Sequence, residues 1–160
     1  MFQEKHQRER ETVIKGLYEV HFQVEQLDRT IAFYEKLGLT LAWKMEGIAF
    51  MWIEPERSWL GLWEKPRGNH VFAKHLAFRV DFEDMPGAID WLKTRGIQPE
   101  GDGKFEPIEP VVRPDQRNAS VYFSDPDGHR LELICPVPGD APKELPKMYW
   151  SEWQRHRSSL

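Results

Sequence analysis

Two histidines and one glutamate carry the most distinctive chemistry that this sequence offers. His21, His75 and Glu132 each stand in a short run of residues that is typical of a β-strand. Neutral imidazole nitrogens and a carboxylate oxygen are common ligands of divalent metals, and a set of three leaves coordination positions open for a substrate. The types and placement of these residues therefore favour a catalytic metal site.

Alternation along the strands places all three side chains on polar faces. In the run around His21 the apolar valines and phenylalanine share one face, which leaves the histidine on the other. The same alternation places His75 and Glu132 on the strand face opposite to that of their apolar neighbours in sequence. Taken singly, such a histidine is more often a solvent-facing residue of an antiparallel sheet. Two such histidines and a glutamate at related positions favour one shared site on a concave face.

A repeated order of elements would position these residues. The first half is typical of a strand over 17–24, a helix from Asp28 to Gly38, and strands over 39–43, 48–53 and 59–63. The second half repeats this order with a strand over 71–80, a helix from Asp84 to Gly96, and strands near Ile97, over 119–123 and over 130–135. The sequence thus predicts an α+β fold of two βαβββ repeats, which form a curved mixed sheet around the metal site with helices outside.

Length and composition fit one folded domain with two flanking segments. A chain of 160 residues buries enough surface to fold without disulfides. We expect a charged N-terminal arm over 1–15, a domain over 16–137 with repeats at about 16–66 and 70–137, and a proline-rich linker with an aromatic tail over 138–160. The aromatic side chains of this tail should dock on the domain or on a partner, and they are Tyr149, Trp150 and Trp153.

Charge and hydropathy exclude several classes of partner. The net charge is −4 and no basic run appears, which argues against a nucleic-acid partner. The longest apolar stretch, residues 48–53, is too short to span a bilayer. A lone cysteine, Cys135, and an N-terminus without an apolar signal segment favour a reducing compartment. We expect a soluble cytoplasmic protein.

Several of these motifs together resemble a known family. They are the strand around His21, Tyr34-Glu35-Lys36-Leu37-Gly38, Lys74-His75-Leu76-Ala77-Phe78, and the hairpin Asp125-Pro126-Asp127-Gly128 that leads to the strand of Glu132. Over residues 16–137 the chain resembles the vicinal oxygen chelate superfamily. That superfamily includes glyoxalase I, fosfomycin-resistance thiol transferases, extradiol dioxygenases and bleomycin-binding proteins.

The resemblance implies roles for individual residues. It assigns His21, His75 and Glu132 as metal ligands and Tyr122 as a catalytic hydroxyl beside the metal. Two positions depart from particular subfamilies. Gly61 stands where glyoxalase I has a fourth ligand, and Gln23, which we assign to substrate binding, stands where fosfomycin transferases carry threonine or cysteine. No single subfamily is matched throughout.

The ligand set limits the chemistry of the metal and of its substrate. Two imidazoles and one carboxylate leave a divalent ion with a net charge near +1, so the ion would act as a Lewis acid on an anionic or polarised substrate oxygen. Mn²⁺, Fe²⁺, Ni²⁺, Co²⁺ and Zn²⁺ all suit these ligands. Arg79 and Arg130 lie on the ligand face and are assigned to a substrate carboxylate or phosphonate. Surface ion pairs are the alternative for both.

The expected function is that of a metal-dependent enzyme on a small oxygen-rich substrate. Thiol transfer, with a thiol co-substrate, or isomerisation is favoured over dioxygenation. The alternative is a non-catalytic protein that sequesters a drug or metabolite, as bleomycin-resistance proteins do. Each βαβββ unit has exposed strand edges that must be paired or covered. We therefore expect a homodimer. In the family that the chain resembles, two units close the cavity either within one chain or by exchange between two chains, and exchange would give metal sites with ligands from both chains.

Overall fold

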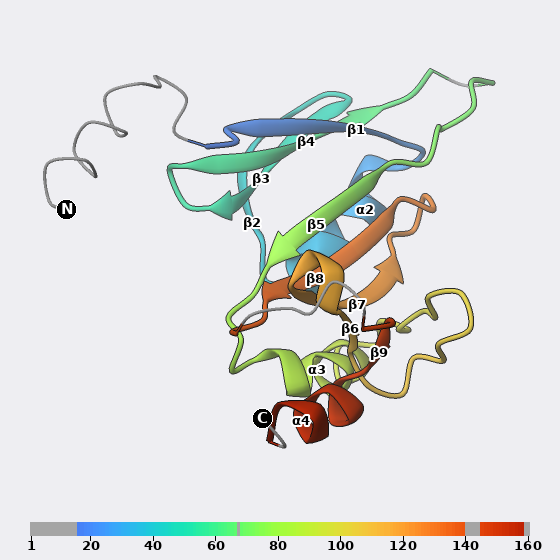
Figure 1. The fold of residues 1–160 in the computed structure, drawn as a ribbon. Coiled ribbons are helices and arrows are strands. Elements are labelled where there is room, and N and C mark those ends of the chain that lie inside the picture. Colours follow the sequence, from blue (N-terminus) through green and yellow to red (C-terminus); the bar gives the residue numbers. More distant parts are fainter. Residues whose placement is uncertain (1–15, 67, 140–144, 159–160) are drawn as a thin grey trace, which may run out of the picture.

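The computed structural model describes residues 16–66, 68–139 and 145–158, which form two sheets with three α-helices (Figure 1). The N-terminal arm expected over 1–15 lies outside the described residues, as do positions 140–144 of the linker. No helix in the described ranges is long and apolar enough to cross a membrane.

The first half of the chain builds a four-stranded mixed sheet. Its elements in chain order are β1 (Glu19–Val24), α2 (Leu27–Lys36), β2 (Thr40–Met45), β3 (Ile48–Glu54) and β4 (Ser58–Glu64). The strand order is β1-β4-β3-β2, in which β1 runs parallel to β4 and the other neighbours are antiparallel. Helix α2 covers one face of this sheet and buries Leu27, Ile31 and Tyr34. Strand β1, which carries His21, is thus an edge strand.

The second half builds a five-stranded mixed sheet. Its elements are β5 (His75–Arg79), the 3₁₀ helix η1 (Met85–Gly87), α3 (Ala88–Lys93), β6 (Val111–Arg113), the 3₁₀ helix η2 (Pro114–Gln116), β7 (Asn118–Ser124) and β8 (Arg130–Pro136). With β9 (Met148–Tyr149) from the C-terminal segment, the strand order is β5-β8-β7-β6-β9, and β5 runs parallel to β8. Strand β5, which carries His75, is also an edge strand.

The C-terminal segment completes the second sheet. Strand β9 (Met148–Tyr149) pairs with β6, and α4 (Trp150–Ser158) follows it directly. Trp150 and Trp153 are buried, and both rings contact Phe82. The expected docking of the aromatic tail is thus confirmed, and it takes place on the domain itself.

The predicted α+β fold and its repeated order of elements are confirmed, with differences in detail. The curved sheet takes the form of two separate mixed sheets. No strand forms at Ile97, and only an isolated bridge joins Glu100 to Tyr122. The second strand of this unit is β6, which begins at Val111, well after the position near Ile97 where we expected a strand.

The start of α2 also differs from the expectation. We predicted Asp28 as its cap, but the helix begins at Leu27, and Asp28 lies in the first turn. The Leu27 N–H donates to Glu64 Oε2 at 2.9 Å, so a carboxylate from the end of β4 satisfies the helix N-terminus instead. This partner is distant in the sequence and is therefore not visible as a local motif.

Alternation along the strands is confirmed by burial. Phe22 and Val24 of β1 are buried, as are Leu131 and Leu133 of β8. Cys135 also faces this apolar side, where burial raises the pKa of its thiol to about 11. A buried thiol that stays protonated is a poor nucleophile.

Candidate metal centre

His75 and Glu132 form the best-defined pair of candidate ligands. They come from the adjacent parallel strands β5 and β8, and His75 Nε2 lies 2.8 Å from Glu132 Oε2. The Glu132 side chain is buried, whereas about half of the His75 side chain is exposed. The pair therefore combines a carboxylate fixed inside the sheet with an imidazole at its surface, which suits two ligands of an ion reached from solvent.

Strand β7 holds the Glu132 carboxylate in place. Ser120 Oγ donates a hydrogen bond to Glu132 Oε1, and Tyr122 is the antiparallel partner of Glu132. Ser120 and Tyr122 lie on the same face of β7 because they are two residues apart. The same parity argument that located Glu132 could have found Ser120, which the sequence analysis missed.

Tyr122 lies between two guanidinium groups. Arg113 Nη2 donates to the Tyr122 hydroxyl at 2.9 Å, and the Arg130 guanidinium carbon lies 4.3 Å from the ring centroid. Burial raises the pKa of the Tyr122 phenol above its ordinary value, and the negative charge of Glu132 raises it further against the opposing charge of Arg113. The phenol is therefore protonated at neutral pH and can donate a hydrogen bond.

His21 lies in the other sheet and has other partners. Trp63 Nε1 donates to His21 Nδ1 at 2.6 Å, and His21 Nε2 lies 3.4 Å from Glu19 Oε1. A neutral imidazole whose Nδ1 accepts a hydrogen bond carries its proton on Nε2. For Nε2 to act as a ligand, the proton must move to Nδ1 and the bond from Trp63 must be given up.

Gly61, the position of the fourth glyoxalase I ligand, has a packing role in this chain. It is the register partner of His21, and a Cβ atom there would lie 3.2 Å from the imidazole and 3.1 Å from Phe50. The absence of a side chain at Gly61 therefore leaves room for the His21 ring. A ligand side chain at this position would need His21 and Phe50 to move.

Within one chain the three predicted ligands do not come together. Among residues 16–66, 68–139 and 145–158 no three His, Cys, Asp or Glu side chains are grouped closely enough to hold an ion. The structure brings together His75 and Glu132 and leaves His21 on the first sheet. These two donors fit part of a divalent metal site, and its remaining ligands must come from elsewhere.

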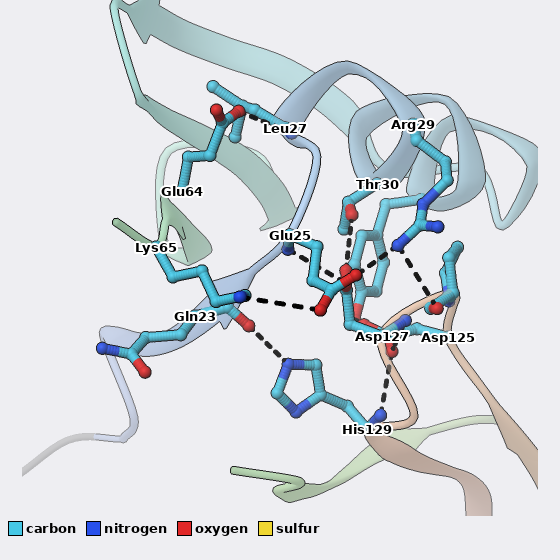
Figure 2. A network of polar contacts seen from close by, with 12 residues as sticks. Gln23, Glu25, Leu27, Arg29, Thr30, Glu64, Lys65, Asp125, Asp127 and His129 are labelled. Atoms are coloured by element: carbon cyan, nitrogen blue, oxygen red, sulfur yellow. Dashed lines mark hydrogen bonds and ion pairs between the residues drawn. The ribbon is translucent and has the colours of Figure 1, made fainter. Parts of the chain in front are cut away.

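The three residues assigned to substrate binding lie at different distances from this pair. Arg130 is the register partner of His75 and contacts the Tyr122 ring. Arg79 is four residues further along β5, about 13 Å from His75 at strand spacing, and makes no ion pair with any described residue. Figure 2 shows the Gln23 side chain pointing away from His129, while its backbone carbonyl points toward it.

The hairpin between β7 and β8 joins the two halves of the chain (Figure 2). Asp127 Oδ1 accepts hydrogen bonds from the Glu25 N–H and from Arg29 Nη2, both at 2.9 Å, and Oδ2 accepts one from Thr30 Oγ1 at 2.8 Å. The Tyr34 hydroxyl donates to Asp125 Oδ2 at 2.9 Å. The two aspartates of the hairpin therefore bind the start and the buried face of α2.

His129, at the end of this hairpin, is fully buried, although a residue beside a turn is usually exposed. Its Nδ1 accepts from the Lys74 N–H at 3.0 Å, its Nε2 lies 2.8 Å from the Gln23 carbonyl, and its ring stacks on Phe22. The ring is buried because the hairpin packs between the end of β1 and the start of β5. The imidazole ties the backbones next to His21 and His75 together.

Asp127→Ala should lower the free energy of unfolding by about 3 kcal/mol. The substitution leaves three donors without their acceptor and breaks an ion pair whose carboxylate is fully buried. Urea denaturation of both proteins measures the difference. Asp28→Ala is the matched control. Asp28 lies on α2, the helix that Asp127 contacts, but its side chain is exposed and pairs with Lys44. This substitution should cost less than about 1 kcal/mol. Equal losses in the two variants would show that the hairpin does not hold the halves together.

Comparisons with known proteins identify the family and the fold of the chain. A sequence profile of the glyoxalase/bleomycin resistance protein/dioxygenase superfamily matches residues 16–133. The chain is 30% identical over 124 residues to a metallothiol transferase FosB from Bacillus licheniformis, covering 75% of each chain. It is 28% identical over 130 residues to a metallothiol transferase FosB from Staphylococcus epidermidis, covering 75% of this chain and 81% of that one. An integron cassette protein from the mobile metagenome of the Halifax Harbour sewage outfall shares the fold with a TM-score of 0.62 at 26% identity, covering 76% of this chain and 99% of the other.

Proposed function

Because the chain belongs to the glyoxalase/bleomycin resistance protein/dioxygenase superfamily, we propose that it is a metal-dependent enzyme for a small oxygen-rich substrate. The observation that carries the proposal is the pair of His75 and Glu132, with a buried carboxylate that Ser120 holds from the neighbouring strand. Thiol transfer is the favoured reaction, which the similarity to proteins named metallothiol transferase supports.

We assign the metal ligands to two copies of the chain in a homodimer. His75 and Glu132 come from one copy, and His21 comes from the second. Two observations support this division. His21 lies apart from the other two within one chain, and its strand β1 is an edge strand of the first sheet. A bound divalent ion, whether Mn, Fe, Ni, Co or Zn, would supply a Lewis acid for a substrate oxygen.

The residues around the pair would select an anionic substrate. The guanidinium carbons of Arg113 and Arg130 lie 5.5 and 4.3 Å from the Tyr122 ring centroid. Two such groups beside a buried hydroxyl donor suit a carboxylate or phosphonate, since guanidinium binds these anions through paired hydrogen bonds. Tyr122 would donate a hydrogen bond to a substrate oxygen. Gln23 and Arg79 would contact the more distant parts of the substrate.

The test is metal-dependent turnover with substrates of two kinds. Fosfomycin tests transfer of a thiol to an epoxide, and the hemithioacetal of methylglyoxal and glutathione tests isomerisation. Each is offered with Mn²⁺, Co²⁺, Ni²⁺ or Zn²⁺, and consumption of free thiol or formation of thioester is followed. Conversion that a chelator stops would support the proposal. If the protein binds the ion but converts neither kind of substrate, the proposal that it is an enzyme is contradicted.

Tyr122→Phe should separate binding of the metal from use of the substrate. The substitution removes the hydroxyl that accepts from Arg113 but keeps the ring between the two arginines. Metal affinity should stay within a few-fold, while kcat/KM for the converted substrate falls about 10²-fold, as expected for the loss of a donor to a reacting oxygen. Calorimetry and steady-state kinetics measure the two effects. If metal affinity and folding are lost together, Tyr122 has a structural role instead.

A sequestering protein is the second candidate, and one surface favours it. On the face of the first sheet that carries His21, ring contacts join Trp43, Phe50, Trp59 and Trp52. The His21 ring contacts both Phe50 and Trp63 and so links Trp63 to this set. Such an aromatic face can bind a planar organic molecule. Binding of a drug without metal and without product would identify this function.

A further inference from the structure

The C-terminal segment reaches the candidate centre through Lys147. This residue lies beyond the residues 16–133 that the superfamily profile matches. It directly precedes β9, whose pairing with β6 sets Tyr149 against Val111 and Met148 against Val112. The backbone pairing therefore delivers the Lys147 side chain to the end of β6, where Arg113 stands.

A continuous set of polar contacts leads from Lys147 to Glu132. Lys147 Nζ and Arg113 Nη2 both contact Asp102 Oδ2. The same guanidinium donates to the Tyr122 hydroxyl at 2.9 Å and to Ser120 Oγ at 3.3 Å. Ser120 in turn donates to Glu132 Oε1. Asp102, Arg113 and Ser120 thus form an unbroken series of contacts between Lys147 and the Glu132 carboxylate.

The charges along this set explain what Lys147 contributes. Burial raises the pKa of the Asp102 carboxyl, but the hydrogen bond from Lys147 and the charges of Arg113, Lys147 and Arg130 outweigh it and hold the pKa below its ordinary value. Asp102 is therefore an anion shared by two cations. Without Lys147, Arg113 would be the one remaining cation in contact with the Asp102 carboxylate among the described residues. The Asp102 carboxylate would then draw the Arg113 guanidinium away from the hydroxyls of Ser120 and Tyr122.

We propose that Lys147 is a positioning residue of the metal centre. Through Asp102 and Arg113 it fixes the hydroxyls of Ser120 and Tyr122 against Glu132, which makes the C-terminal segment a functional part of the site. This inference rests on the proposed function only where it takes Glu132 as a metal ligand. The positioning of Arg113 can be measured without any metal.

The alternative is that Lys147 merely anchors the tail, and the chain offers a matched control for it. Lys104 and Lys147 both place their ammonium nitrogen 5.4 Å from the Phe105 ring centroid. Only Lys147 contacts Asp102. Lys104→Met therefore removes an equivalent cation from the same ring without touching the set of contacts that leads to Glu132.

The experiment compares wild type with Lys147→Met, Lys104→Met and Lys147→Arg. The first measurement is the affinity for Co²⁺ and the visible absorption of the Co²⁺ protein, which reports the coordination of the ion. Lys147→Met should weaken Co²⁺ binding by about tenfold and change the spectrum, as expected for the loss of an outer-shell partner. Lys104→Met should match wild type, and Lys147→Arg should recover most of the affinity.

The second measurement is NMR of the ¹⁵N-labelled Arg113 side chain in metal-free protein. Restricted guanidinium signals are expected in wild type and in Lys104→Met, and exchange-broadened signals in Lys147→Met. Unchanged Arg113 signals in Lys147→Met would overturn the inference, as would equal losses of affinity in the two methionine variants. If wild type binds no Co²⁺ but Arg113 loosens in Lys147→Met, the proposed function fails while the positioning role stands.

Discussion

Glu132→Gln should abolish tight binding of a divalent ion by the purified protein. The amide keeps the size of the side chain and an acceptor for Ser120, but it removes the negative charge that a divalent ion needs. Loss of an outer-shell partner typically costs roughly 10–100-fold in affinity, so loss of a ligand charge should cost more than about 100-fold. Metal content after reconstitution and calorimetric titration measure the effect.

Thermal unfolding gives an independent measure of the same prediction. A ligand that binds only the folded state at about 100 times its Kd adds about 2.7 kcal/mol of stability. Excess metal should therefore raise the Tm of wild type and leave that of Glu132→Gln unchanged. Glu83→Gln is the control, since Glu83 is an exposed carboxylate in the same half of the chain. If the Tm of Glu132→Gln rises as much as that of wild type, Glu132 is not a ligand.

The parts of the fold that could be predicted are those that depend on local periodicity. Strands β1, β5 and β8 were located because their apolar side chains recur every second residue, and this parity also gave the faces of His21, His75 and Glu132. The helices were located by Gly38 just after α2 and by Pro86 in η1, because glycine and proline are local signals of where a helix ends and starts. Local pattern was sufficient wherever one face of an element is buried.

The parts that could not be predicted depend on partners distant in sequence. Strand β9 has two residues and forms because it pairs with the edge of β6. Strand β6 has three residues, so both strands are too short to show a periodic pattern. His129 follows a turn, where exposure is the rule, and it is buried because Phe22 and two backbone groups close around it. The contacts of Asp102 with Arg113 and Lys147 likewise join three separate segments.

The division of the ligands between sheets leads to the second large effect. Within one chain His129 ties β1 to the start of β5, yet His21 does not join His75 and Glu132. The first sheet also exposes apolar side chains on the face that carries His21, namely Trp43, Met45 and Trp63. Exposed apolar surface of this kind is typical of an interface. A second copy that covers it would bring its own His75 and Glu132 toward this His21.

Mixing two inactive variants tests this arrangement directly. His21→Ala and Glu132→Ala should each fail to bind metal as homodimers. In a heterodimer with exchanged halves, one site takes both substitutions and the other takes neither. Heterodimers purified with two different affinity tags, after joint unfolding and refolding, should therefore bind one ion per dimer, half of the wild-type amount. Refolding each variant alone is the control and should give none.

The opposite result has an equally clear meaning. If all ligands of a site came from one chain, every chain in the heterodimer would carry a damaged site, and no metal would be recovered. A monomeric mass by light scattering would contradict the exchanged dimer independently. Because the recovered site needs His21 from one chain and Glu132 from the other, a stoichiometry of one ion per heterodimer cannot arise from refolding alone, and it would place these two ligands on different subunits.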